Sequence, residues 1–392
     1  MKERGNPIIR FLAILLVLSS LFLGFPGRVK AFLPEDIDVQ PRTLNLLRGE
    51  SALISFYLPK SALVTTKIFD SSHFLMATLE DHLRCPEGRH TVKWNGRDTD
   101  GVLVPPEAYY FTTKIEFDDG RHGLYNPAFS GGKDMGLIST KIDKQKREVS
   151  YHLTESARIR IRAGVQKGPL RKTILDWVPS GSGNHVVAWD GKDETGTEVI
   201  WNKEGFVLNA TAFSLPPYSI IVSNSENDYI DYWTERARRS GMALMEYMRT
   251  SRDAGAALVR AREVASKVLS GTSGRLSNYY LINTFINRMP EVGMSFRGDG
   301  IVSTGDVPVV KGRVSINVTL SELTRKILTE QRYEVVFYVD DVLIGEDETG
   351  YSPYTWILDT TTLTNGPHII TVNIATLSDQ VGSCSRKIMV SN

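Results

Sequence analysis

Residues 90–101 read His90-Thr-Val-Lys-Trp94-Asn95-Gly96-Arg97-Asp98-Thr-Asp-Gly101, and residues 185–196 read His185-Val-Val-Ala-Trp189-Asp190-Gly191-Lys192-Asp193-Glu-Thr-Gly196. Every matched position differs by 95, and the same offset pairs Leu58, Ser61 and Ala62 with Leu153, Ser156 and Ala157. Self-similarity at one offset marks a repeated structural unit. The sequence therefore predicts two copies of one domain of about 95 residues.

The repeated element is typical of a strand that runs into a tight turn. Its Asx-Gly pair favours a turn with positive φ, and the aspartate that follows can accept hydrogen bonds from nearby backbone amides. The tryptophan at the strand end is expected to fill the space between two sheets. Both copies hold all four residue types, as Trp94, Asn95, Gly96 and Asp98, and as Trp189, Asp190, Gly191 and Asp193.

Short alternating runs flank the repeated element in both copies. Residues 53–58 and 63–69 are rich in β-branched and aromatic side chains and are bounded by turn residues. Residues 157–162, Ala-Arg-Ile-Arg-Ile-Arg, alternate strictly. We therefore expect their apolar face in the core and their arginines in water. Strands at this spacing predict β-sandwiches.

Strand patterns return from about residue 307. Residues 314–320 alternate, and residues 335–339 join residues 342–344 through Asp340-Asp341, which predicts a hairpin. Residues 368–374 and 386–390 supply the last strands. A third sandwich is expected here.

Two resemblances extend this interpretation. Residues 88–109, Gly-Arg-His-Thr-Val-Lys-Trp-Asn-Gly-Arg-Asp-Thr-Asp-Gly-Val-Leu-Val-Pro-Pro-Glu-Ala-Tyr, resemble the Ig-like domain of the flagellar hook-capping protein FlgD, over most of residues 45–117. The second copy departs from that pattern at residues 201–206. The resemblance implies a module that also occurs in many other secreted bacterial proteins, and it does not by itself imply a flagellar role. Residues 337–345 and 356–368 are similar to bacterial Ig-like domains of surface and secreted proteins.

The first 31 residues have the three parts of a secretory signal. Basic residues precede an apolar run over residues 11–25, which is shorter than the roughly 20 residues that a membrane-spanning helix needs. Val-Lys-Ala follows at residues 29–31, so cleavage is expected between Ala31 and Phe32. The alternative is an uncleaved N-terminal anchor. We expect a periplasmic or extracellular protein, with membrane contact only through an uncleaved signal segment.

A helical segment separates the second and third sandwiches. Apolar residues recur at three- and four-residue steps from Ile230 to Met248, and a second helical run covers residues 254–269, after a possible break at Arg252-Asp253. One interpretation is a spacer packed on a neighbouring sandwich. The other is a partner-binding or self-associating helical pair. Residues 279–286 fit either a helix or a strand.

The predicted class is all-β, with three immunoglobulin-like β-sandwiches in tandem and a helical insert between the second and third. The expected division is a signal peptide (1–31), a first FlgD-type sandwich (32–118), a linker leading into the next strand (119–146), a second FlgD-type sandwich (147–224), the helical insert (225–290), a linker (291–305) and a bacterial Ig-like sandwich (306–392).

The sequence supports neither a catalytic nor a cofactor site. No HExxH, GxSxG, phosphate-loop or dinucleotide motif occurs, and Cys85 and Cys384 have no metal-ligand spacing between them. Both cysteines are interpreted as buried small hydrophobic residues. His90 and His185 are expected to make structural hydrogen bonds, because no nucleophile or orienting acid accompanies them.

The sequence gives only weak support to a calcium site or a sugar-binding platform. The Asp98 to Gly101 cluster supplies few of the six or more oxygens that Ca²⁺ needs, and Thr195 stands where Asp100 would recur. The aromatic side chains that would form a sugar-stacking platform are Tyr109, Tyr110, Tyr351, Tyr354 and Trp356. Alternation is expected to bury about half of them.

The nearly neutral charge balance, 46 basic and 45 acidic residues, gives no attraction for nucleic acid. The sequence predicts a non-enzymatic structural, adhesion or scaffolding protein that presents its modules to a protein or polysaccharide partner. The alternative is an accessory subunit of an exported hydrolase or surface assembly, flagellar-type assemblies included, docked through the helical insert. A glycan-cleaving enzyme would need two carboxylates about 5 to 10 Å apart in a cleft.

Overall fold

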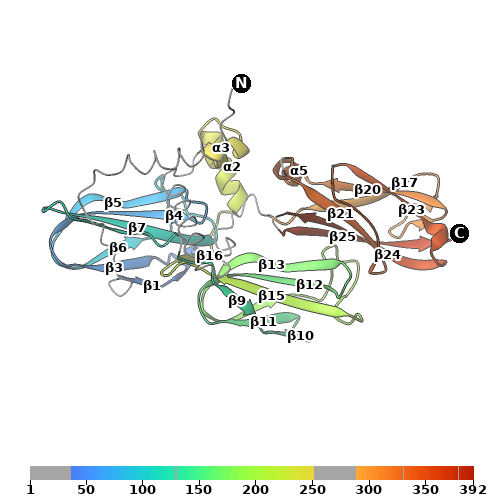
Figure 1. Ribbon diagram of the computed structural model, residues 1–392, viewed down its shortest axis with the longest axis horizontal. Coiled ribbons are helices and arrows are strands. Elements are labelled where there is room, and N and C mark those ends of the chain that lie inside the picture. Colours follow the sequence, from blue (N-terminus) through green and yellow to red (C-terminus); the bar gives the residue numbers. More distant parts are fainter. Residues whose placement is uncertain (1–36, 129, 251–287, 330, 378) are drawn as a thin grey trace, which may run out of the picture.

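The computed structural model describes residues 37–128, 130–250, 288–329, 331–377 and 379–392. Within them the chain consists mostly of strands in six sheets. In Figure 1 these sheets form three sandwiches, one at the left, one below the centre and one at the right. The predicted all-β class of tandem sandwiches is confirmed.

The first sandwich pairs a three-stranded sheet, in the order β1-β3-β6, with a sheet in the order β2-β16-β7-β4-β5, to which β8 adds through β7. Its own strands are β1 (Ile37–Gln40), β2 (Thr43–Asn45), β3 (Ala52–Leu58), β4 (Ala62–Asp70), β5 (Leu75–Cys85), β6 (Gly88–Trp94), β7 (Glu107–Phe117) and β8 (His122–Tyr125). A short 3-10 turn, η2 (Leu46–Arg48), follows β2. The predicted alternation is seen in β3, where inward residues are buried and outward residues are not.

The second sandwich repeats this plan with sheets β10-β11-β14 and β13-β12-β15-β9. Its strands are β9 (Asp134–Leu137), β10 (Thr140–Asp143), β11 (Glu148–Leu153), β12 (Ala157–Val165), β13 (Leu170–Ser180), β14 (Gly183–Ala188) and β15 (Phe206–Ser214). Strands β12 and β13 begin and end 95 residues after β4 and β5. The offset found in the sequence is therefore an offset between equivalent strands.

Strand β16 (Ile220–Asn224) differs from the expected division. It follows the second sandwich in sequence, yet it pairs antiparallel with β7 and parallel with β2 of the first. Its apolar residues 220–222 are all buried, because the strand lies inside a sheet at the contact between two sandwiches. Residues 220–224, expected in the second sandwich, thus complete the first.

The helical insert contains α2 (Tyr229–Arg239) and α3 (Leu244–Thr250) in its described part. Asp228 caps α2 by accepting from the amides of Ile230 and Asp231. The helical pattern continues to Met248 in the sequence, but in the structure α2 ends at Arg239. Gly241 follows with a positive φ of 67°, which stops the helix. Residues 251–287, with the second helical run and the segment 279–286, lie outside the described residues. None of the described helices is long and apolar enough to cross a bilayer.

The third sandwich pairs a sheet β17-β20-β23 with a sheet β18-β19-β25-β24-β21-β22. Its elements are β17 (Val292–Arg297), β18 (Ile301–Ser303), β19 (Val309–Val310), β20 (Arg313–Leu320), α5 (Glu322–Leu328), β21 (Tyr333–Val339), β22 (Val342–Asp347), β23 (Tyr354–Asp359), η4 (Thr360–Thr362), β24 (Gly366–Thr376) and β25 (Val381–Val390). The expected hairpin is present, with Asp340 and Asp341 at φ of 47° and 69°.

Both segments that the sequence assigned to linkers contain strands. Strands β8, β9 and β10 lie within residues 119–146, and β17 and β18 within residues 291–305. These strands are short or carry glycines and polar residues, so their own pattern is weak. Their pairing with β7, β15, β11, β20 and β19 stabilises them instead.

Candidate functional site

The repeated turn has the same hydrogen bonds in both copies. Trp94 and Trp189 are buried, and each indole N–H donates at 2.9 Å to a carbonyl three residues later, on Arg97 and Lys192. The Asx side chains at 95 and 190 accept from the amides of those same two residues. The backbone of the turn and these hydrogen bonds are therefore repeated together in the two copies.

Glycine is required at the tightest point of each copy. A Cβ at Gly96 would collide with the Leu46 side chain, and one at Gly191 would collide with the Trp201 ring. All four turn glycines have positive φ, which other residues rarely adopt. These glycines are Gly96, Gly101, Gly191 and Gly196.

The repeated aspartates close the turn through one carboxylate oxygen. Asp98 Oδ1 accepts from the amides of Asp100 and Val102, both at 2.9 Å. Asp193 Oδ1 accepts from the amide of Thr197 at 2.7 Å. Both aspartates are buried, so each needs partners for its second oxygen as well.

That second oxygen reaches a different partner in each copy. Asp98 Oδ2 accepts from the Tyr232 hydroxyl at 2.6 Å and pairs with the Arg236 guanidinium, both on α2. Asp193 Oδ2 pairs with Arg171 Nη2 at 3.1 Å, on β13 of its own sandwich. With these contacts made, the carboxylate of Asp98 is engaged by amides, a phenol and a guanidinium, an arrangement that suits an ion pair better than calcium.

Helix α2 packs on the first sandwich through its apolar face. Tyr229, Tyr232 and Trp233 are buried, and the Trp233 ring lies 4.5 Å from that of Phe74. These contacts agree with the spacer interpretation of the insert. The outward side of α2 carries an exposed ion-paired cluster of Glu235, Arg238 and Arg239.

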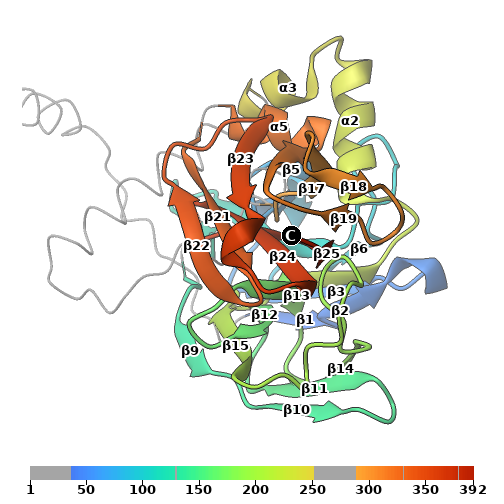
Figure 2. The ribbon, with the colours of Figure 1, turned by 90° about the vertical axis from the view of Figure 1, so that its right-hand side faces the viewer.

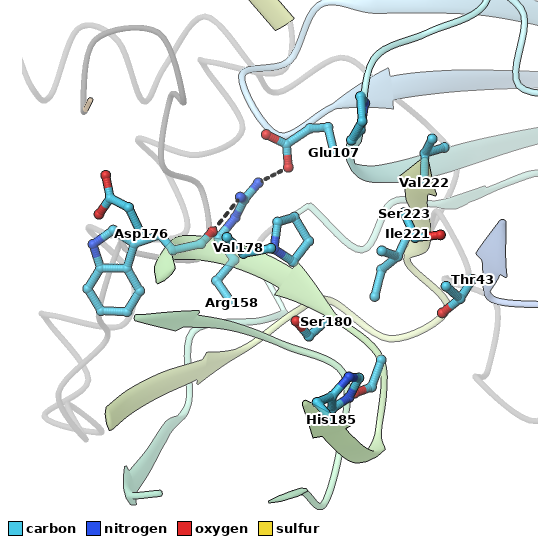
Figure 3. Close-up of a pocket in the computed structure, with 14 residues that line it drawn as sticks. Thr43, Glu107, Arg158, Asp176, Val178, Ser180, His185, Ile221, Val222 and Ser223 are labelled. Atoms are coloured by element: carbon cyan, nitrogen blue, oxygen red, sulfur yellow. Dashed lines mark hydrogen bonds and ion pairs between the residues drawn. The ribbon is translucent and has the colours of Figure 1, made fainter. Parts of the chain in front are cut away.

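The first and second sandwiches meet at a buried ion pair. Arg158 on β12 bonds through Nη2 to Glu107 Oε1 on β7, and both side chains are only 1% exposed. Arg158 Nη1 also donates to the Trp177 carbonyl at 3.1 Å (Figure 3). The Glu107 carboxylate in addition accepts from the Ala108 amide at 2.6 Å. The pair is thus held from both sandwiches.

A cavity of about 490 Å³ adjoins this pair. The first sandwich lines it from β2, β7 and β16, and the second from β12, β13 and β14. Figure 3 shows Glu107 and Arg158 on one side of the cavity, Ile221 and Thr43 on another, and His185 below. The cavity is therefore formed only when the two sandwiches are joined.

The expectation that the arginines of β12 face water is wrong. Arg158 is buried as described, and the side chains of Arg160 and Arg162 are 12% and 13% exposed. Arg160 Nη2 pairs with Asp379 Oδ2 at 2.6 Å, and Arg162 Nη2 donates to the Asp379 carbonyl at 2.6 Å. The outer face of this sheet is covered by the neighbouring sandwiches, so the alternation separates the core from domain junctions.

The second and third sandwiches meet around Arg171. Its side chain is fully buried and pairs with Asp193, with Glu198 at 2.9 Å and with Asp341 Oδ1 of the third sandwich at 2.7 Å. Lys203 pairs with the other oxygen of Asp341 at 2.6 Å. Figure 2 looks along the molecule from the third sandwich and shows its strands β24 and β25 directly above β13.

Backbone groups extend this junction. The Leu170 amide donates to Asn373 Oδ1 at 3.0 Å, and the Asn373 amide group donates back to the Leu170 carbonyl at 2.8 Å. Thr195 and Thr197 both donate to the Ser385 carbonyl at 2.9 Å. These bonds tie the repeated turn of the second copy to β25.

The two matched histidines hydrogen-bond to different groups. His90 Nε2 lies 2.6 Å from Glu80 Oε1, and His185 Nε2 donates to the Gly181 carbonyl at 2.7 Å. Cys85 and Cys384 are free and buried, on different sandwiches. Burial raises the pKa of the Cys384 thiol to about 11.

The proposed aromatic platform is not assembled. Tyr109, Tyr110 and Tyr354 are buried, whereas Tyr351 is exposed. The cleavage residues Ala31 and Phe32 lie outside the described residues. Sequence reasoning missed the junction residues Glu107, Arg158 and Arg171, because a charged residue in an alternating strand normally faces water.

Comparison with known proteins identifies one region. Residues 301–372 match the bacterial Ig domain family, within the third sandwich. Compared by sequence, no curated protein matches this chain.

Solved structures with similar parts include an endo-beta-1,4-mannanase from Thermotoga petrophila, at 15% identity and a TM-score of 0.20, over 51% of this chain and 30% of that one. A tetra-tandem repeat from the extending region of a large adhesion protein matches at 13% identity and 0.17, over 88% and 71%. A 1.5-MDa bacterial ice-binding adhesin matches at 11% and 0.18, over 93% and 100%. At these TM-scores the whole chains do not superpose.

Proposed function

We propose that this chain is an exported, non-enzymatic structural protein that holds three Ig-like sandwiches in one rigid arrangement and presents their outer surfaces to a protein or polysaccharide partner. The observation that carries the proposal is the buried ion pairing at both junctions. Glu107 with Arg158 joins two buried side chains of different sandwiches, and the fully buried Arg171 joins the partly exposed Asp341 of the third sandwich.

Buried ion pairs favour one orientation more than they add strength. Separated sandwiches could hydrate these charges again, so the net stabilisation is small. A tilted junction, in contrast, would leave a charge buried without its partner, which is costly. Most domain junctions are exposed linkers that permit relative motion. This chain therefore suits a stiff spacer or scaffold.

The modular interpretation supports the same role. The match to the bacterial Ig domain covers most of the third sandwich. We infer from the Trp-Asx-Gly element that the first two sandwiches are FlgD-type modules used here without a flagellar function. Modules of this kind suit proteins of the cell surface or exterior.

The ionisable groups at the first junction favour a structural role over glycan cleavage. Glu107 borders the cavity, but its carboxylate is bound by Arg158 and by the Ala108 amide. A general acid or nucleophile needs a carboxylate free to reach a substrate. Glu107 is instead committed to the contact between sandwiches.

Small-angle X-ray scattering of the purified chain tests the rigid arrangement. We expect one compact profile that the three-sandwich structure fits, and a larger maximum dimension for Arg171→Met. A wild-type profile that only a flexible ensemble fits would contradict the proposal.

Export is tested separately. Cell fractionation should place the chain outside the cytoplasm, and N-terminal sequencing should begin at Phe32. A cytoplasmic chain that retains Met1 would contradict export without touching the scaffold role.

A further inference from the structure

Three ligand-type side chains meet at one open edge of the first sandwich. Glu80 and Cys85 lie on β5, and His90 lies on β6. Strand β5 is the last strand of one sheet, and β6 is the last strand of the other. The cluster therefore spans the two sheets of the sandwich at their edge.

A β-bulge places Glu80 and Cys85 on the same side of β5. Residues five apart in a regular strand point to opposite faces. Here Thr66 pairs with Glu80 and Val64 with Leu83, so β5 has one residue more than β4 in this interval. His82, with a positive φ of 49°, lies within that interval. The extra residue turns the Glu80 and Cys85 side chains to the same side of β5, because a bulge redirects the side chains that follow it.

The three ligand atoms have distances suited to one metal ion. All lie within 4.8 Å of one another. Cys85 Sγ is 3.6 Å from His90 Nε2. Tetrahedral zinc, with Zn–S of about 2.3 Å and Zn–N of about 2.0 Å, separates such ligands by about 3.5 Å. His90 Nε2 and Glu80 Oε1 are 2.6 Å apart, a hydrogen-bond distance. A metal ion would replace that hydrogen bond after a small rotation of Glu80.

The surroundings hold the ligands in place. The Thr66 hydroxyl donates to Glu80 Oε2 at 3.0 Å, which leaves Oε1 directed at His90. The His90 ring lies 5.3 Å from that of Phe56. Side-chain exposure is 7% for Glu80 and 19% for His90, so the site is sheltered yet reachable. Outer contacts of this kind orient metal ligands.

The second copy provides an internal comparison. The positions 95 residues on are Leu175, Ser180 and His185. The bulge recurs there, with Trp177 at a φ of 53°, but the Glu and Cys ligands do not. The retained His185 bonds instead to a backbone carbonyl. A structural hydrogen bond accounts for His185, whereas in the first copy a thiol and a carboxylate both lie beside the histidine.

We propose that Glu80, Cys85 and His90 bind a single Zn²⁺ ion, with a fourth position open to water, and that this ion clips the two sheets of the first sandwich together. Thiolate, imidazole and carboxylate are the ligand types zinc takes. We propose that this chain is exported, and its two cysteines lie on different sandwiches. The ion would link the two sheets of the first sandwich as a disulfide does in other exported domains. The site does not depend on the proposed scaffold role.

Metal binding releases one proton. Zinc binds the thiolate form of cysteine, so the proton of the Cys85 thiol leaves as the metal enters.

Cobalt titration tests the site directly. We expect the metal-free chain to bind one equivalent of Co²⁺, with a near-ultraviolet thiolate-to-cobalt absorption band that Zn²⁺ displaces. Cys85→Ser should abolish the band. The matched controls Cys384→Ser, at the other cysteine, and His185→Ala, at the equivalent histidine, should keep it.

A second variant protects the test against misfolding of Cys85→Ser. Glu80→Gln keeps a hydrogen bond to His90 and should fold, as circular dichroism would show, but should weaken Co²⁺ binding at least about tenfold because it removes an anionic ligand. Absence of the band in the wild-type chain at one equivalent would overturn the proposal. An unchanged band in Cys85→Ser or unchanged affinity in Glu80→Gln would also overturn it.

Discussion

The two copies of the repeat share a backbone frame and differ in what that frame contacts. In the first copy the buried Asp98 obtains its guanidinium from α2, through Arg236. In the second, the buried Asp193 obtains it from Arg171 on its own sandwich, at the position where the first copy has Met76. Arg171 then extends to Asp341 of the third sandwich.

The two copies show how one repeated module can bind different neighbouring elements. The turn, its tryptophan and the bulge are the same in both copies, since they determine the local fold. Side chains at the edges differ, so the first copy contacts helix α2 and the second copy contacts the third sandwich. Residues exchanged between equivalent positions should therefore break a particular junction.

The largest effect is expected from Arg158→Leu, which gives β12 the residue found at Leu63 in β4. It leaves Glu107 buried without its cation, and breaking a buried pair costs about 3–5 kcal/mol. The melting temperature should fall markedly. Arg84→Leu, which breaks an exposed pair with Asp118, is the control and should leave it nearly unchanged. Equal effects of the two substitutions would contradict the buried junction.

Arg171→Met gives the second copy the residue of the first, Met76. Asp193, Glu198 and Asp341 lose their common cation, but Glu198 and Asp341 are partly exposed and can be hydrated. We expect a loss of roughly 2–3 kcal/mol, below the range for fully buried pairs. Denaturant unfolding measures it. No change in the midpoint would show that Arg171 does not stabilise the second and third sandwiches.

A smaller effect is expected from Tyr232→Phe, which removes the hydroxyl that donates to Asp98. The loss should be about 1 kcal/mol, as for a single hydrogen bond to a charged group or slightly less. Tyr57→Phe, at an exposed position, is the control. Hydrogen exchange should show faster opening of α2 in the first variant alone, and equal rates would contradict the docking of α2 on the turn.

The smallest effect concerns Asp176, the counterpart of the exposed Asp81. Burial raises the Asp176 pKa, and the charges of Arg162 and Arg160 oppose this only in part. A carboxyl whose folded pKa is raised stabilises the fold at low pH, and this contribution is lost as pH rises through the folded pKa. Asp176→Asn should raise the melting temperature at pH 7 but not near pH 3.5.

Asp81→Asn is the matched control for Asp176→Asn and should change nothing at either pH. A lower melting temperature of Asp176→Asn at pH 7 would mean that Arg160 and Arg162 stabilise the ionised carboxylate more than burial penalises it.

The local fold was predictable because it follows from local patterns. Alternation located β3, β4 and β20, and the Asx-Gly pairs located the turns at Gly96 and Gly191. The return of β16 to the first sandwich was not predictable, since residues 220–222 suit any buried strand. Arg158 was misplaced for a related reason: alternation separates two faces of a strand but does not say what covers the outer one.

The ligand cluster was hidden by the bulge in β5. Glu80 and Cys85 are an odd number of residues apart, so a regular strand would separate them. His90 lies in another sheet, and only the turn after Cys85 brings it near.

Distance measurement between spin labels tests the rigid arrangement most directly. Labels on cysteines introduced at the exposed positions Val186, in the second sandwich, and Val302, in the third, would report the junction, since Cys85 and Cys384 are buried. We predict one narrow distance distribution in the otherwise wild-type chain and a broad one when Arg171→Met is added. A distribution equally broad with and without Arg171 would contradict the account.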